Sequence, residues 1–378
     1  MLGAGGGSPR PKKRRRERNM ATQRQDSYRL GRALFVAGAI LALSSAAMLA
    51  QQTAKEPNNP DQIVVNDSGG AMGTWMRKAY FDAFEKAYGI RVVETSPTDF
   101  GKLRAMVESG NVEWTVTEIG GQDAIRAERM GLVERIDDTI VDRSKFPAEA
   151  RSPYVFAASV YSTVLAYRKD VFKGDHPKTW ADFWDVKRFP GPRSLRNHPV
   201  DNLEFALLID GVPPDKLYPL DLDRAFKKLD EIKPFVTVWW TTGAQPAQLL
   251  LDKEVVLASG WNGRFFDLLV KEAPIDIEWD GGALKKGSFV IPKGAKDANW
   301  GQKFLALMAD PKLEAIYANA LGYPGLIPDS IQFTDPKLAP FLPTEPNNLK
   351  KQFWISDRWW AENAGQAIER WNQWLLKK

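Results

Sequence analysis

The chain has 378 residues, 44% of them hydrophobic and 26% charged, which excludes a largely disordered protein and predicts two lobes of about 100–200 residues each. Its net charge of +5 comes from residues 1–50, where ten Lys and Arg stand against two acids and leave +8; the remainder, at −3, gives no sign of nucleic-acid binding. The lack of cysteine excludes disulfides, thiolate metal sites, cysteine nucleophiles and a cysteine-linked lipid anchor.

The first predicted element is a Sec-type signal peptide over residues 1–50. The basic run Lys12–Arg16 precedes the apolar run Ala33–Leu43 and a stretch of small residues, an order that favours export over a nucleic-acid patch. Cleavage is expected between about Ala47 and Gln51, and would release the mature chain into the periplasm. An uncleaved anchor is the alternative, but the apolar run is shorter than the ~20 residues that a membrane span needs.

After a polar, Pro-rich linker at residues 51–60, strand and helix patterns alternate. Short apolar runs predict strands, and apolar residues at helical spacing before a glycine predict helices. This order predicts a parallel sheet covered by helices on both faces. The predicted strands are Ile63–Asn66, Ile90–Glu94 and Trp114–Ile119, and the predicted helices run from about Met72 to Tyr88, from Asp99 to Ser109 and from Gln122 to Met130.

Two β-rich runs, Val155–Tyr167 and Leu257–Trp261, are predicted to pass between two α/β halves. Between them, Thr179 and Asp182 predict a capping box at a helix start, and Phe235–Ser259 predicts a strand, a helix and a strand. The two crossings predict a hinged pair of lobes. The predicted division is lobe 1 at 61–158 and 262–330, lobe 2 at 159–261, and a C-terminal helical segment at 331–378 that docks on the lobes.

The C-terminal segment predicts one helix that begins after Ser356. An aromatic ligand box is one interpretation of this helix. A helix that buries its rings against a lobe is favoured, because aromatic stripes at helical spacing usually mark buried faces. The residues at helical spacing are Trp359, Trp360, Ala367, Ile368, Trp371 and Trp374.

Catalytic patterns are scarce. The two histidines, His176 and His198, have no metal-type partner spacing, and neither HExxH nor GxSxG occurs. We therefore expect no enzyme, no metal site and no cofactor. Two glycine pairs, Gly69-Gly70 and Gly120-Gly121, are more informative, because each follows a predicted strand and opens a helix. Ligands of open α/β sheets lie at such places, where helix N-termini offer free N–H groups.

From Ile63 onward, the chain resembles the spermidine/putrescine (polyamine) class of periplasmic solute-binding proteins. The resemblance implies an α/β fold of two lobes with type II connectivity and a ligand cleft between the lobes. It also implies a monomer that closes on a small-molecule solute and delivers it to the permease subunits of an ABC transporter. The resemblance rests on the order and spacing of FDAFEKAYGIRVVE (81–94), MGLVERID (130–137), TWADFWDVKRFPG (179–191), EVVLASGWNGR (254–264), FVIPKGAKD (289–297) and ALGYPGLIP (320–328).

The same resemblance implies which residues line the cleft. Polyamine binders hold ammonium groups with aromatic rings and carboxylates, but glycines stand here where the first lobe would supply rings. Asp201 is the one cleft carboxylate that carries over. The implied ligand-binding residues are Ser68, Gly69, Gly70, Gly121, Gln122, Asp201, Trp240, Thr241, Thr242, Trp261, Asn262, Arg264 and Tyr323.

Two ligand classes follow. The resemblance implies a polyamine, but Arg264 in a closed cleft would repel a diammonium ligand. A zwitterionic, amino-acid-like or opine-like solute fits the residues better, with its amine on Asp201 and its acid group on Arg264 and the glycine-loop N–H groups. A surface salt bridge of Arg264 with Asp267 or Glu272 is the alternative for this residue. An α/β hydrolase and a ferric-iron binder are less favoured, because catalytic motifs and clustered tyrosines are lacking.

Overall fold

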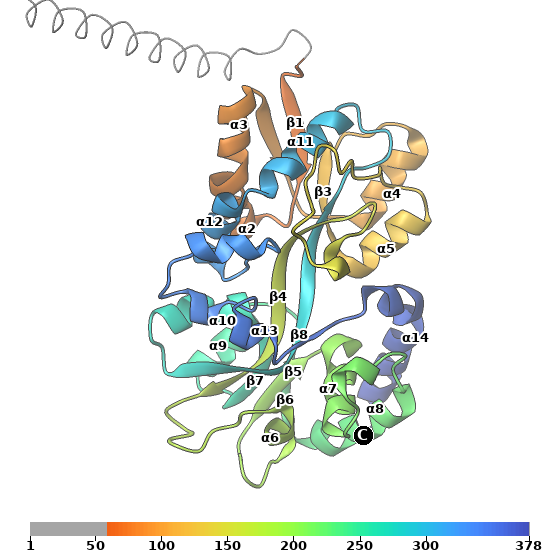
Figure 1. Cartoon of the computed structure of the whole chain (residues 1–378). Helices are drawn as coiled ribbons and strands as arrows, with labels where there is room; N and C mark the ends of the chain where they lie inside the picture. Colours follow the sequence, from red (N-terminus) through yellow and green to blue (C-terminus); the bar gives the residue numbers. More distant parts are fainter. Residues whose placement is uncertain (1–58, 378) are drawn as a thin grey trace, which may run out of the picture. The chain divides into compact units, whose positions relative to one another are not determined.

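The computed structural model describes residues 59–377. The predicted signal peptide at 1–50 and most of the predicted linker at 51–60 therefore lie outside the described residues. Within residues 59–377, strands and helices alternate along the chain (Figure 1). No helix of this part is long and apolar enough to cross a membrane.

Nine strands and thirteen α-helices are described, together with short 3-10 turns and a π-helical turn at Arg77–Phe81. The strands are β1 (Gln62–Asn66), β2 (Arg91–Thr95), β3 (Val116–Gly120), β4 (Phe156–Arg168), β5 (Arg193–Arg196), β6 (Val236–Trp240), β7 (Leu257–Trp261), β8 (Ile275–Val290) and β9 (Phe353–Trp354). The helices are α2 (Gly70–Met76), α3 (Asp82–Tyr88), α4 (Phe100–Ser109), α5 (Gly121–Arg129), α6 (Trp180–Trp184), α7 (Pro199–Ile209), α8 (Leu222–Ile232), α9 (Gln245–Leu251), α10 (Asn262–Val270), α11 (Ala298–Met308), α12 (Pro311–Leu321), α13 (Pro346–Leu349) and α14 (Asp357–Leu376).

The strand order β2-β1-β3-β8-β4-β7-β5-β6 contains two equivalent groups. In one group β1 lies between its parallel partners β2 and β3, and in the other β5 lies between β6 and β7. Each group is completed by an antiparallel strand, β8 beside β3 and β4 beside β7. This is the two-lobed α/β fold with type II connectivity that the sequence predicts.

The two longest strands, β4 and β8, pair antiparallel along most of their length and lie side by side in Figure 1. The first crossing predicted at Val155–Tyr167 corresponds to β4. The predicted return at Leu257–Trp261 is wrong, because this run is β7, which pairs with β4 and β5, whereas β8 pairs with both β3 and β4. Gly281-Gly282 and Lys285-Lys286 interrupt the apolar pattern of β8, so the run does not resemble one buried strand.

Helix ends follow the predicted local signals. The Asp99 side chain accepts a hydrogen bond from the Lys102 N–H at 3.0 Å at the start of α4, and Gly110 ends this helix at a φ of 73°. At α6, Thr179 accepts from the Asp182 N–H at 3.2 Å, and Asp182 accepts from the Thr179 N–H at 3.0 Å. The predicted capping box is thus confirmed.

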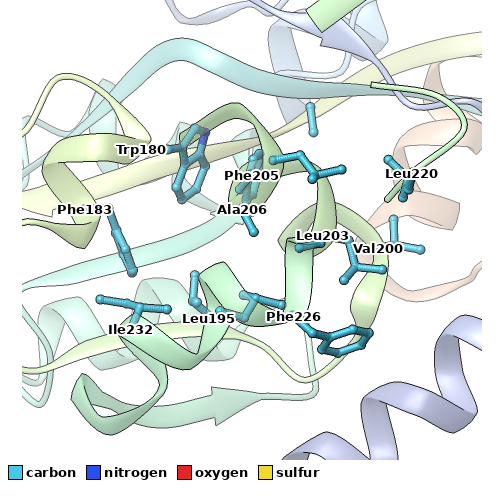
Figure 2. Close-up of a cluster of buried hydrophobic side chains, with 14 of the residues drawn as sticks. Trp180, Phe183, Leu195, Val200, Leu203, Phe205, Ala206, Leu220, Phe226 and Ile232 are labelled. Carbon is cyan, nitrogen blue, oxygen red and sulfur yellow. The ribbon is translucent and has the colours of Figure 1, made fainter. Parts of the chain in front are cut away.

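One hydrophobic core cluster is built around α6, α7 and α8, and the C-terminal helix α14 packs into it. Figure 2 shows Trp180 and Phe205 of this cluster, whose rings stack with centroids 3.7 Å apart. Trp360, Trp371 and Trp374 of α14 are buried in the same cluster, and Trp360 Nε1 donates to the buried Glu204 at 2.7 Å. The structure confirms that α14 buries its rings.

Candidate functional site

A cavity of about 270 Å³ lies between the carboxyl ends of β1 and β3, the middle of β4 and the start of α10. The carboxyl edge of a parallel sheet is where α/β proteins hold ligands, and the volume suits a small one. The cavity is lined by Ser68, Met72, Thr98, Glu118, Ile119, Gly120, Ser159, Tyr161, Trp261, Arg264, Lys286, Gly287 and Tyr323.

The acidic side of this cavity is Glu118 of β3. Its Oε2 accepts hydrogen bonds from the backbone N–H and the hydroxyl of Ser68, at 2.7 and 2.6 Å. The two residues meet because Ser68 follows β1, the parallel neighbour of β3. Burial raises the pKa of Glu118 above its ordinary value, although the two hydrogen bonds from Ser68 oppose this effect. A cation in the cavity would favour the charged form of this carboxylate.

The basic side is Arg264, in the first turn of α10. Its guanidinium lies 5.9 Å from the centre of the Trp261 ring. The Nε atom of Arg264 and the Nε1 atom of Trp261 are buried, and neither has a hydrogen-bond partner among residues 59–377. Buried donors are normally paired, so these two are available to an acceptor on a ligand.

Arg264 forms no salt bridge within the described part of the chain. The alternative pairing with Asp267 does not occur, because Asp267 lies 3.4 Å from Lys271 on the exposed face of α10. The position of the guanidinium is set by packing: a Cβ on Gly243 would come within 3.1 Å of Arg264 Nε and 2.6 Å of the Trp261 ring. The turn before α9 therefore holds both side chains against the cavity.

Three aromatic rings form the remaining wall. Tyr161 of β4 makes edge contacts with Trp261 and with Tyr323, each at a centroid distance of 6.1 Å. Tyr323 follows α12 and is 7% exposed. It reaches the cavity because Gly263 has no side chain: a Cβ there would overlap the Tyr323 ring. Such rings exclude water and strengthen charge interactions with a bound solute.

A second cavity, of about 140 Å³, shares Gly120, Tyr161 and Lys286 with the first. No group of His, Cys, Asp and Glu side chains that could hold a metal ion occurs in residues 59–377. The further lining residues of the second cavity are Gly121, Gln122, Arg196, His198, Val200, Lys285, Ile355, Asp357 and Trp360.

The N-terminus of α5 is occupied by a carboxylate of the chain itself. Asp357, the first residue of α14, pairs with Lys286 at 3.1 Å. Its carboxylate also lies against Gly121, where a Cβ would overlap it. The predicted role of Gly121 as an N–H donor to a ligand anion does not agree with this arrangement, since Asp357 supplies the negative charge that a helix N-terminus favours.

Asp201 does not face the first cavity. It is 1% exposed and pairs with Lys285 of β8, while Thr163 donates to its Oδ2 at 2.9 Å. Arg196 lies 3.8 Å from the same oxygen. The predicted role of Asp201 as partner of a ligand amine does not agree with this pairing, because the carboxylate already has a cation and a hydroxyl.

The remaining predicted residues support the cavity from outside. Gly69 and Gly70 open α2 at φ values of 69° and 62°, which glycine adopts without strain, and the Gly69 N–H donates to Asp67 at 2.7 Å. Thr241 and Thr242 form an exposed turn whose N–H groups donate to Gln245 at 2.6 and 3.0 Å.

Trp240 and Asn262 are buried and have structural partners. Trp240 Nε1 donates to Ser259 Oγ at 3.1 Å, and its ring packs edge-on against Trp261 at 5.6 Å. Asn262 accepts from the Ser162 N–H at 2.9 Å and donates to the Gly322 carbonyl at 2.8 Å. Of the predicted residues, those in the first cavity are thus Ser68, Trp261, Arg264 and Tyr323.

The functional residues that sequence reasoning missed lie on strands. Glu118 is the one carboxylate of β3 and stands two residues before the Gly120-Gly121 pair. This position at the carboxyl edge of the sheet is a signal that could have identified Glu118 as a cavity residue. Tyr161 lies in the middle of β4, and Lys286 lies in β8, which was not predicted as a strand. Only the pairing of β4 with β8 brings them to the cavity.

The chain is similar over most of its length to bacterial solute-binding proteins. The family model "Bacterial extracellular solute-binding protein" matches residues 79–344. A gamma-aminobutyric acid-binding protein of Pseudomonas aeruginosa is 31% identical, over 83% of this chain and 91% of its own length. A spermidine/putrescine-binding periplasmic protein of Escherichia coli is 24% identical, over 64% of this chain and 72% of its own.

Solved structures give the same result. An ABC transporter substrate-binding protein from Bradyrhizobium japonicum USDA 110 matches with a TM-score of 0.79 and 40% identity, over 84% of this chain and 100% of its own. The Atu4243-GABA receptor matches with a TM-score of 0.78 and 36% identity, over 84% of this chain and 98% of its own. AgtB of A. tumefaciens R10, in complex with agropinic acid, matches with a TM-score of 0.70 and 31% identity, over 85% of this chain and 100% of its own. These likenesses agree with the two-lobed α/β fold.

Proposed function

Since this chain belongs to the bacterial extracellular solute-binding proteins, and is the substrate-binding protein of an ABC transporter, we propose that its solute is a small zwitterion. The solute would carry an amine and a carboxylate a few carbons apart, as γ-aminobutyrate does. The observation that carries this proposal is that one small cavity holds a partly buried acid, Glu118, together with two donors that have no partner among residues 59–377, on Trp261 and Arg264. The protein captures its solute and works with permease subunits.

The charges of the cavity support a zwitterion over a polyamine. A diamine needs two negative partners, and Glu118 is the one carboxylate that lines the first cavity. The guanidinium of Arg264 in the same cavity would repel a second ammonium, and exclusion of water would strengthen that repulsion. The likeness to a gamma-aminobutyric acid-binding protein and to the Atu4243-GABA receptor supports the same ligand class.

A longer, opine-like solute is the second candidate. The second cavity, of about 140 Å³, adjoins the first through Gly120, Tyr161 and Lys286, and Arg196 adds a further cation to its wall. A solute with an additional acidic arm would extend into this space. The likeness to AgtB, solved with agropinic acid, favours including such solutes in any test.

The solute class is tested by thermal unfolding and titration calorimetry of the mature chain. γ-Aminobutyrate is expected to raise the unfolding midpoint, because a ligand at 100 times its Kd stabilises the folded state by about 2.7 kcal/mol. The panel includes 5-aminovalerate, agropinic acid, putrescine and spermidine. Tighter binding of putrescine or spermidine than of every zwitterion would overturn the proposal, and tightest binding of agropinic acid would establish the opine candidate instead.

We propose that the chain is exported to the periplasm as a soluble, non-catalytic monomer by cleavage of its signal peptide between about Ala47 and Gln51. The support is the order of basic, apolar and small residues within residues 1–50 and membership of an extracellular family. Intact-mass analysis of a periplasmic extract is expected to give a chain that begins near Gln51. A full-length species confined to the membrane fraction would contradict this proposal.

We further propose that binding closes the two lobes about β4 and β8. β8 pairs with β3 of one group, β4 pairs with β7 of the other, and the two strands pair with each other, so they are the segments about which the groups would rotate. β8 replaces Leu257–Trp261 as the return strand, and the other residue limits predicted from the sequence for the lobes stay a prediction.

A further inference from the structure

Lys285 of β8 is buried beside the solute cavities. Its side chain is 9% exposed, and the residue lines the second cavity. Its Nζ donates to the Asp201 carboxylate, to Thr163 Oγ1 at 2.7 Å and to the Ala283 carbonyl at 3.3 Å. Nζ also lies 5.5 Å from the centre of the Tyr161 ring.

These contacts amount to a complete ammonium site. A primary ammonium has three N–H donors and no acceptor, and each donor of Lys285 has its own acceptor: a carboxylate, a hydroxyl and a carbonyl. The Tyr161 ring adds the aromatic neighbour that favours a cation. An alkylammonium ion would use the same four groups.

The acceptors are held in place independently of the lysine. Asp201 adopts a φ of 75°, a region that residues other than glycine rarely occupy, and its side chain is also bonded to Thr163 at 2.9 Å. Thr163 belongs to β4, and Asp201 belongs to the kinked start of α7. Removing the Lys285 stem would leave these acceptors facing space continuous with the second cavity.

We infer that Lys285 is a specificity-determining residue: its tethered ammonium fills an ammonium site beside the solute cavity and thereby excludes diamines. The inference rests on the proposed function, in which Glu118 holds the one amine of a zwitterion. A diamine that reached from Glu118 towards Asp201 would meet the ammonium of Lys285 and would be repelled. Without this lysine, the Oδ1 atom of Asp201 would lose its cation while Arg196 stays 3.8 Å from Oδ2, so Asp201 and Glu118 would provide two carboxylates for two ammonium groups.

The test uses Lys285→Ala, with wild type and the double variant Lys285→Ala/Asp201→Asn as matched controls. Ethylammonium chloride should raise the unfolding midpoint of Lys285→Ala by about 2 °C or more above sodium chloride at equal ionic strength. Wild type, whose site is filled, and the double variant, whose carboxylate is removed, should show only the smaller difference between the two salts that ammonium binding at Glu118 gives in all three proteins. In titration calorimetry, Lys285→Ala should bind putrescine at least about tenfold more tightly than wild type does.

A difference between ethylammonium and sodium that is no larger in Lys285→Ala than in wild type, or an unchanged putrescine affinity, would overturn the inference and leave Lys285 as a structural ion-pair partner. If Lys285→Ala does not fold in sodium chloride, it is refolded in either salt. A refolding yield that rises only with ethylammonium supports the site, and a yield that is the same in both salts overturns it.

The ethylammonium response separates this inference from the proposed function, because it requires no solute in the first cavity. If wild type ignores γ-aminobutyrate while Lys285→Ala responds to ethylammonium, the proposed solute is wrong and the ammonium site stands. If wild type binds γ-aminobutyrate and Lys285→Ala ignores ethylammonium, the solute stands and the role of Lys285 is wrong.

Discussion

Replacing Arg264 with alanine is expected to weaken the binding of γ-aminobutyrate by roughly 2–5 kcal/mol, or about 30-fold to a few thousand-fold in Kd. The guanidinium has no salt bridge within residues 59–377 and an unpaired buried Nε, so it is free to form a charge-assisted hydrogen bond with a carboxylate. Its loss would leave the solute carboxylate with Trp261 Nε1 as a neutral donor. Titration calorimetry of wild type and Arg264→Ala gives the difference directly.

Two controls make this prediction specific. Arg264→Lys keeps the positive charge but loses the planar set of donors, so an intermediate loss is expected. Lys271→Ala removes an exposed cation at the C-cap of the same helix and should leave Kd unchanged. Putrescine should bind Arg264→Ala no more weakly than it binds wild type. Tight spermidine binding by wild type that the substitution leaves unaffected would contradict the assigned role of Arg264.

Glu118→Gln should weaken the free energy of γ-aminobutyrate binding by a similar amount, roughly 2–5 kcal/mol, because it removes the charged partner of the amine. Glutamine keeps the shape of the side chain, and its carbonyl oxygen can still accept the hydrogen bonds from Ser68. Glu134→Gln is a matched control, since Glu134 also accepts a backbone N–H, from Gly294 at 3.0 Å, but lies outside both cavities. An unchanged Kd for Glu118→Gln would show that the amine binds elsewhere.

Glu118 also sets the expected pH dependence of γ-aminobutyrate binding. Burial raises the pKa of Glu118, so the empty cavity takes up a proton on this carboxylate at a higher pH than an ordinary glutamate would. The solute amine favours the deprotonated form of Glu118. The affinity for γ-aminobutyrate should therefore be highest above the raised pKa and should fall as the pH drops through it. Calorimetry at a series of falling pH values should show this loss in wild type and a smaller change in Glu118→Gln.

Most helices and strands of the fold can be predicted from local patterns in the sequence. The alternation of short apolar runs with helices, the cap at Asp99 and the capping box at Thr179 all describe elements that form from neighbouring residues. The strand β8 is different, because Gly281-Gly282 and Lys285-Lys286 break its apolar pattern. Pairing with β4 decides its structure, and pairing between distant segments is not visible in a local pattern.

The site is less predictable for the same reason. Trp261 ends a predicted strand and Arg264 follows it, so their position at the cavity could be anticipated from the chain order. Asp201 was expected to bind an amine, and its actual partner, Lys285, is 84 residues away. No feature of the sequence near Asp201 indicates this partner, because the ion pair depends on β8 lying beside β4.

Each group of parallel strands is completed by a long antiparallel strand, β8 beside β3 and β4 beside β7. This pairing also governs the order in which the chain can fold. β3 receives its antiparallel neighbour β8 only after residue 287, and α14 completes the core around α7 only at residue 376. Until then β3 remains an open edge, and neither half has its full set of partners. Pairing over such separations slows folding, because a long loop must close before the contact is made. Under the export that we propose, a chain that completes its core this late would still be unfolded when its first residues reached a translocation channel.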